Sequence, residues 1–233
     1  CVFRGHPDKI ADQISDRILD ECLAQDKNSR VAVETLIKNN LIVLAGEVTT
    51  NANVSYKNVA LSVLKDLGYG NLEDFEFVIE ISKQSPDIAL GVDKDGAGDQ
   101  GIMYGLATSE SKELMPLPIV LARKIAIKMD ELTSKIPELF GSDGKCQVSI
   151  AYDENDNPVK VTTIIVSQQT KTNVDREFYT SFIIEECLKK AIPSWLITGE
   201  TKVLINPTGE FVKGGAYADS GLTGRKIICD TYG

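Results

Sequence analysis

The 233-residue sequence is poor in the residues from which several common sites are built. It holds one histidine and one tryptophan, and its five cysteines lie far apart with no pair separated by two residues. This spacing indicates neither a zinc site nor a disulfide framework, and it favours a reduced, cytoplasmic setting. A Ser-His-Asp triad could form only around His6, where no nucleophile motif occurs.

Basic charge and long apolar runs are also scarce. The 25 lysines and arginines stand against 34 acidic residues, which gives a formal net charge of −9. A general nucleic-acid surface is not expected, because phosphate backbones need a basic face, although a few placed cations can still hold a small anion. No apolar run approaches the roughly 18–20 residues of a membrane span, and no signal peptide is visible. We therefore expect neither a nucleic-acid nor a membrane partner.

The remaining composition is that of a folded globular chain, with 42% hydrophobic and 25% charged residues. An amphipathic helix is predicted to begin near Pro7, since proline suits the first helical turn. Apolar side chains then recur at helical spacing, at Ile10, Ile14, Ile18 and Cys22. Three carboxylates on a neighbouring face are interpreted as solvated helix charges, namely Asp12, Asp16 and Asp20.

A unit of strand, turn, strand, helix and strand occurs twice in the hydrophobic pattern. The first copy has strands at 31–37, 41–48 and 75–81 with a helix at 55–67, and the second has strands at 146–152, 159–168 and 201–205 with a helix at 174–191. The pattern predicts an α+β fold of repeated β-β-α-β units, with sheets covered by helices. We expect a first repeat domain at 1–95, a glycine-rich loop and connecting helix at 96–144, and a second repeat domain at 145–233. A further strand is expected just before residue 230.

The segment at 5–9 brings the histidine, a carboxylate and an amine to the start of the first helix. A helix N-terminus favours anions, and an aspartate can hold a hard cation such as magnesium. The alternative is that His6 is an ordinary polar cap. The polar residues at 83–87, where a strand ends, are candidates of the same kind, or simply a loop.

Two further segments are rich in glycine. Residues 96–101 read Gly-x-Gly-x-x-Gly, but no strand directly precedes them, so the dinucleotide fingerprint is not predicted. Residues 205–226 hold clustered glycines followed by Arg225 and Lys226. A planar guanidinium beside an ammonium suits a polyphosphate, although no Walker A motif is present. The alternative is a bulged loop before a strand that carries two surface cations.

Five sequence words, in this order along the chain, resemble the S-adenosylmethionine synthetase family, also called methionine adenosyltransferase. They are GHPDKIADQISD at 5–16, KQSPDI at 83–88, GAGDQGIMYG at 96–105, INPTG at 205–209 and GLTGRKIICDTYG at 221–233. The resemblance covers nearly the whole chain and implies repeated, pseudo-symmetric α+β domains. It also implies a reaction in which ATP and L-methionine give S-adenosylmethionine, and the triphosphate is split to phosphate and pyrophosphate.

The resemblance further implies roles for individual residues. His6 resembles the histidine that donates to the departing triphosphate, Asp8 a magnesium ligand, and Glu34 the potassium-site carboxylate. The implied nucleotide and phosphate contacts are Asp143, Lys145, Phe211, Asp219, Arg225 and Lys226. The implied methionine contacts are Glu47, Gln84, Asp99 and Asp219. Family members are homodimers or homotetramers with the site between subunits, and the same assembly is expected here.

Some positions depart from the family pattern. Arg4 stands where the family has an acidic residue, and Glu210 stands where it has an arginine. The family chain also continues past the segment that ends at Gly233, so we expect this sequence to be part of a longer protein. Two alternatives stay open: a non-catalytic or regulatory relative that binds nucleotide or a catalytic partner subunit, and a transferase that joins ATP to another thioether.

Overall fold

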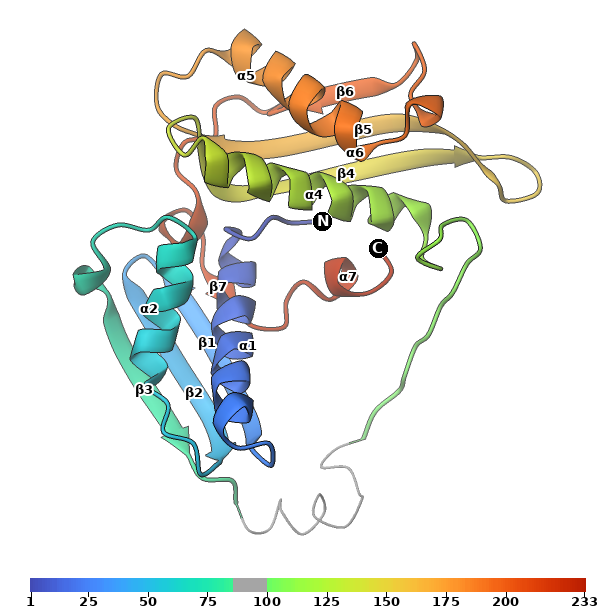
Figure 1. Ribbon diagram of the computed structural model, residues 1–233. Coiled ribbons are helices and arrows are strands. Elements are labelled where there is room, and N and C mark those ends of the chain that lie inside the picture. Colours follow the sequence, from blue (N-terminus) through green and yellow to red (C-terminus); the bar gives the residue numbers. More distant parts are fainter. Residues whose placement is uncertain (86–99) are drawn as a thin grey trace.

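The computed structural model describes residues 1–85 and 100–233, which contain two β-β-α-β units (Figure 1). The first unit consists of β1 (Arg30–Lys38), β2 (Leu41–Thr49), α2 (Tyr56–Asp66) and β3 (Glu76–Ser82), with a 3-10 turn at Leu72–Asp74. In the second, β4 (Phe140–Tyr152) and β5 (Pro158–Thr170) precede α5 (Arg176–Ile183), a π-helical turn (Ile184–Leu188), α6 (Lys189–Ala191), a 3-10 turn (Ser194–Leu196) and β6 (Lys202–Ile205). In both units the first two strands are antiparallel and the third is parallel to the second. The predicted repeat and the α+β fold are therefore confirmed.

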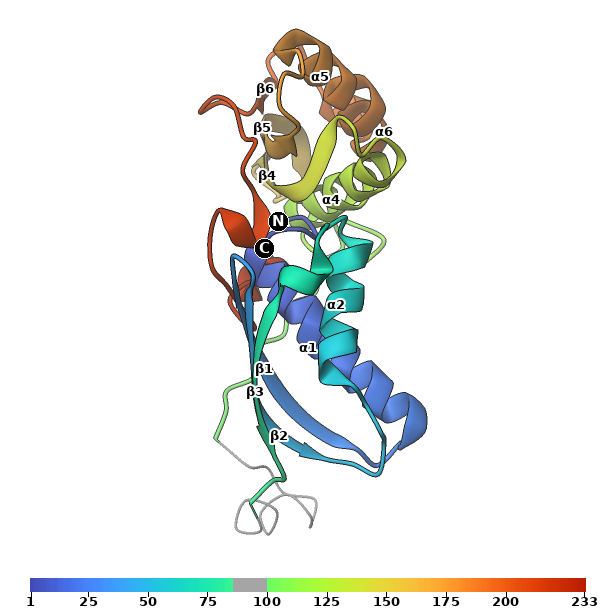
Figure 2. The ribbon, with the colours of Figure 1, turned by 90° about the vertical axis from the view of Figure 1, so that its left-hand side faces the viewer.

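Helices cover one face of the first sheet and leave the other face open. Figure 2 shows α2 and α1 (Pro7–Gln25) on the same side of β1 and β2. On β1, Val33 and Ile37 are buried toward the helices, whereas Glu34 is exposed, as the two-residue period of a strand requires. Burial of apolar side chains between helix and sheet stabilises this unit. The open face carries both apolar side chains, such as Leu41 and Val78, and the exposed Glu34 and Glu47.

The second unit has a core of its own, formed around α4 (Leu117–Lys135). Leu121, Ile125 and Met129 recur every four residues and are fully buried, as expected for one face of a helix. They belong to the same apolar cluster as Ile164 of β5. Within the described ranges, no helix combines the length and the apolarity needed to cross a bilayer.

The segment that follows β6, residues 206–233, returns to the first unit and joins its sheet, and we call it the returning segment. β7 (Gly221–Leu222) pairs with β1, which gives the strand order β3-β2-β1-β7. Glycine is required at 221, because a Cβ atom there would lie 2.0 Å from the carbonyl oxygen of Pro7. The chain then forms α7 (Ile227–Asp230), and both ends of the chain lie between the two units in Figure 1. The glycine-rich segment is thereby brought to the N-terminus of α1.

Two predicted elements differ from the structure. The strand expected before residue 230 is wrong, since Ile227–Asp230 forms the helical turn α7. The chain turns at Gly224, where φ is +77°, and the side chain of Asp230 pairs with Lys9, so tertiary contacts override the β propensity of Ile227 and Ile228. In addition, β4 begins at Phe140 rather than at residue 146, because the Gly-Ser-Asp-Gly run pairs with β5 through an irregular register.

Candidate active site

His6 caps the N-terminus of α1. Its Nδ1 atom accepts a hydrogen bond from the backbone N–H of Asp8 at 3.2 Å. A neutral ring in this arrangement carries its proton on Nε2. Burial, and next the nearby charge of Lys226, lower the pKa of His6 to about 4. At neutral pH the side chain is therefore an uncharged hydrogen-bond donor.

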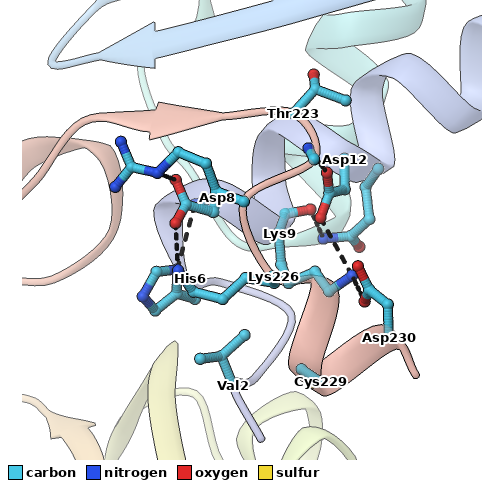
Figure 3. Close-up of polar contacts among 12 residues, drawn as sticks. Val2, His6, Asp8, Lys9, Asp12, Thr223, Lys226, Cys229 and Asp230 are labelled. Carbon is cyan, nitrogen blue, oxygen red and sulfur yellow. Dashed lines mark hydrogen bonds and ion pairs between the residues drawn. The ribbon is translucent and has the colours of Figure 1, made fainter. Parts of the chain in front are cut away.

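Asp8 lies in the first turn of α1 and is completely buried. Its Oδ1 accepts from the backbone N–H of Leu222 at 3.0 Å and pairs with Nε of Arg225 at 3.2 Å, while Oδ2 pairs with Lys226 (Figure 3). Burial alone would raise the pKa of Asp8, but the bond from Lys226 and then the Leu222 N–H hold that pKa below its ordinary value. An ionised carboxylate thus fixes both cations of the returning segment.

Two other residues of α1 hold the same segment. Oδ1 of Asp12 accepts from the backbone N–H of Gly224 at 2.8 Å, and Lys9 bridges Asp12, at 3.1 Å, and Asp230 of α7. The interpretation of Asp12 as a solvated charge is wrong, since its side chain is only 13% exposed. The sequence contained a signal for this role, because Asp8 and Asp12 are four residues apart and share a helix face. Asp16 and Asp20 are exposed, as predicted.

The second unit contributes Asp143 and Lys145 from β4. The carboxylate of Asp143 is buried, and its Oδ2 accepts from the backbone N–H of Gly215 at 2.7 Å. Burial raises the pKa of Asp143, although the Gly215 N–H opposes the shift. The charges of Lys145 and Asp219 also act on His6, so the start of α1, β4 and the returning segment all contribute charge near one imidazole.

Near these residues the surface is hollowed. A cavity of about 410 Å³ has Lys145 and Lys226 on its wall, together with the apolar side chains of Val2, Ile165 and Ile228. It has the mixed apolar and cationic lining that a nucleotide-sized anion would need. Phe211 lies beside the end of β5. Its carbonyl oxygen accepts a hydrogen bond from the backbone N–H of Thr170, the last residue of that strand, at 2.8 Å.

The methionine-site candidates do not join this group. Glu47 of β2 lies opposite Ala32, whereas β7 meets β1 at Leu36 and Ile37. The separation is four to five positions along β1, or roughly 13–16 Å at about 3.3 Å per residue. Gln84 follows β3, whose Ser82 lies opposite Glu47. Asp99 lies outside the described residues, as do residues 86–88 of the segment at 83–88 and residues 96–99 of the segment at 96–101.

The described residues do not assemble a metal centre. Three cationic or N–H donors already occupy the oxygens of Asp8, and Glu34 is exposed on the open face of β1. Within the ranges 1–85 and 100–233, no group of three His, Cys, Asp or Glu side chains could hold a metal ion. In this arrangement cations and an N–H donor engage Asp8, and the roles of Asp8 at magnesium and of Glu34 at potassium stay predictions.

Comparison with known proteins gives the family. Residues 1–86 match the model of the S-adenosylmethionine synthetase N-terminal domain, and residues 94–211 match that of the central domain. The chain belongs to the S-adenosylmethionine synthetase family. It is 45% identical to the S-adenosylmethionine synthases of Akkermansia muciniphila, Petrotoga mobilis and Thermus thermophilus, with all of this chain covered in each case. It spans 64–65% of the length of these relatives.

The structure places both residues that depart from the S-adenosylmethionine synthetase pattern. Arg4 points to α4, where it pairs with Asp130 at 3.3 Å, and its Nε donates to Gln13 at 3.1 Å. It therefore links the two units and adds no charge to the group around His6. Glu210 is exposed next to Phe211.

Proposed function

We propose that the whole protein is a cytoplasmic methionine adenosyltransferase, which forms S-adenosylmethionine from ATP and L-methionine and splits the triphosphate to phosphate and pyrophosphate. One observation carries this proposal. Lys145 of the second unit and Lys226 of the returning segment line one cavity, and Lys226 pairs with Asp8, whose backbone N–H donates to the ring of His6. Membership of the S-adenosylmethionine synthetase family supports the same reaction.

In the proposed reaction, a lone pair of the methionine sulfur forms a bond to C5′ of the ribose, and the C5′–oxygen bond breaks. The electron pair leaves with the triphosphate, so negative charge grows on the bridging oxygen. The Nε2–H of His6 would donate to that oxygen and would stabilise the transition state more than bound ATP. Because His6 is uncharged, its role is that of a positioned donor and not of a strong acid.

The triphosphate would lie against Lys145, Arg225 and Lys226. Asp8 orients the last two cations, but it also neutralises part of their charge. Asp143, Phe211 and Asp219 would contact the nucleotide. Further cations from the part of the relatives that this chain does not span would complete the phosphate site.

The methionine would be held by Glu47, Gln84, Asp99 and Asp219. Since Glu47 and Gln84 lie away from His6 within one chain, we propose that each site is shared between two copies. The open face of the first sheet, which carries Glu34 and Glu47, is the surface on which a second copy would bring its residues to His6. A homodimer or a homotetramer would satisfy this requirement.

The family resemblance also implies magnesium and potassium as cofactors, and we include both in the proposal. Their chemistry would be to neutralise charge on the phosphates. The oxygens of Asp8 are engaged by Arg225, Lys226 and the Leu222 N–H, so no step is assigned to a metal. The steps above depend only on side chains of this chain.

The test is a product assay on the full-length protein with ATP, L-methionine, magnesium and potassium. S-adenosylmethionine, phosphate and pyrophosphate are expected in equal amounts. Nucleotide binding without product would instead support the non-catalytic relative. Turnover with another thioether but not with methionine would support the different transferase.

A further inference from the structure

Tyr69 of the first unit reaches into the segment that closes the proposed nucleotide site. It lies three residues after the end of α2, and its hydroxyl oxygen accepts a hydrogen bond from the backbone N–H of Ala216 at 2.9 Å. Its ring stacks on Tyr217 at 5.7 Å between centroids and meets Phe75 edge-on at 6.1 Å. Burial raises the pKa of Tyr69 to about 12, so the hydroxyl stays protonated. The side chain is thus held on both sides of its ring and at its tip.

The turn that Tyr69 contacts also holds Asp143. Gly215, the residue before Ala216, donates its backbone N–H to the Asp143 carboxylate at 2.7 Å. Its φ of +61° favours glycine, and a Cβ atom there would lie 2.1 Å from the hydroxyl oxygen of Tyr69. The close approach of Tyr69 and the bond to Asp143 therefore depend on the same residue.

The peptide between Gly215 and Ala216 links Tyr69 to Asp219 as well. Peptide groups are planar, so the bond from the Ala216 N–H to Tyr69 also orients the carbonyl of Gly215. That carbonyl accepts from the backbone N–H of Asp219 at 3.2 Å and from that of Ala218 at 3.0 Å. One hydroxyl group thus restrains the turn on which both Asp143 and Asp219 depend.

We propose that Tyr69 is a positioning residue for nucleotide binding, which acts through the turn at 215–217 on Asp143 and Asp219. The proposal rests on the proposed function, because it needs these carboxylates to contact the nucleotide. The contact of Tyr69 also links the two units. Tyr69 belongs to the first unit, whereas Asp143 belongs to the second unit and Asp219 to the returning segment.

The decisive variant is Tyr69→Phe in the full-length protein, because it keeps the stacked ring and removes only the hydroxyl. The matched control is Tyr217→Phe, which removes a hydroxyl from the same turn; among the described residues that hydroxyl makes no hydrogen bond. Loss of one hydrogen bond changes an equilibrium by roughly 3- to 10-fold. We expect the KM for ATP to rise by about that factor in Tyr69→Phe, with kcat within about twofold of wild type.

Amide hydrogen exchange of the peptide covering 212–220 supplies a readout that does not require turnover. Exchange at Gly215 and Ala216 should be faster in Tyr69→Phe and unchanged in Tyr217→Phe. Unchanged exchange in Tyr69→Phe would overturn the proposal, and so would faster exchange with an unaltered KM for ATP. If the wild-type protein shows no turnover, the proposed function fails separately, and the dissociation constant of ATP replaces KM as the test of Tyr69.

Discussion

The phosphate end and the methionine end of the proposed site are built in different ways. At the phosphate end, the buried carboxylate of Asp8 holds Arg225 and Lys226, and the hydrogen bond to Gly215 holds Asp143. At the methionine end, Glu47 is exposed on an open sheet face. It lies opposite Ala32 of β1, several residues along that strand from the place where β7 pairs with it. The difference indicates that one chain organises the phosphate end by itself, whereas the methionine end needs a second surface.

The largest effect is expected from Lys226→Ala at the phosphate end. Loss of a cation that faces developing charge should lower kcat/KM for ATP by about 10²- to 10³-fold. The buried Asp8 would also lose a partner, so the melting temperature should fall. Lys202→Ala, which removes an exposed lysine of β6, is the control and should leave both quantities unchanged. Steady-state kinetics and thermal unfolding measure the two effects, and wild-type kinetics in Lys226→Ala would remove this lysine from the site.

A somewhat smaller effect is expected from His6→Ala. Product formation should slow by about 10²-fold, because the donor acts mainly on charge that develops in the transition state. The dissociation constant of ATP should change far less. Single-turnover rates and equilibrium binding separate the two quantities.

His6→Asn is the matched variant, since asparagine also caps helices and also carries an N–H donor. It should retain part of the rate that His6→Ala loses. Equal rates in wild type and His6→Ala would exclude His6 from the chemistry.

At the methionine end, Glu47→Gln should raise the KM for methionine by about 10-fold, the usual effect of losing a hydrogen bond between charged groups. The KM for ATP should stay within about twofold of wild type. Initial rates with each substrate varied in turn measure both constants. A change confined to ATP would move Glu47 to the phosphate end.

Mixed oligomers sharpen the same comparison. Chains carrying Lys226→Ala and chains carrying Glu47→Ala, refolded together, should regain roughly one quarter of wild-type activity, because each mixed dimer forms one unaltered site. If each site lies within a single chain, the mixture will be no more active than its components. The separately refolded variants serve as the baseline.

The smallest effect is expected from Arg4→Ala. The pair with Asp130 is partly exposed, with 41% and 29% of the two side chains accessible, so its loss should lower the free energy of unfolding by less than about 1 kcal/mol. Activity should not change, because Arg4 points toward α4. Urea unfolding and a product assay check the two statements, and a tenfold loss of activity would place Arg4 in the site.

Local patterns were sufficient where the structure depends on local spacing. The two-residue and four-residue periods predicted the strands and helices of both units, because each element buries one face in its own core. The family resemblance implies that His6, Lys145 and Lys226 belong to one site, and this assignment stays a prediction. The domain boundaries at 95 and 144 stay a prediction.

Local patterns failed where a residue finds its partner far along the chain. Asp12 was interpreted as a solvated charge, although it accepts from Gly224, and the role of Tyr69 depends on a contact with Ala216. The helical turn α7 was predicted as a strand for the same reason. Each of these features is set by contacts across more than 100 residues of sequence, and no local period identifies the distant partner.

By itself, the sequence determined the repeated β-β-α-β order, the cap at His6 and the family to which the chain belongs, because these follow from spacing and composition over short stretches. Only the tertiary structure decided that the returning segment pairs with β1 and brings Lys226 to Asp8. The physical reason is the burial of Asp8, since an ionised carboxylate without water needs cations and N–H donors, and here the chain supplies them from residues 222–226.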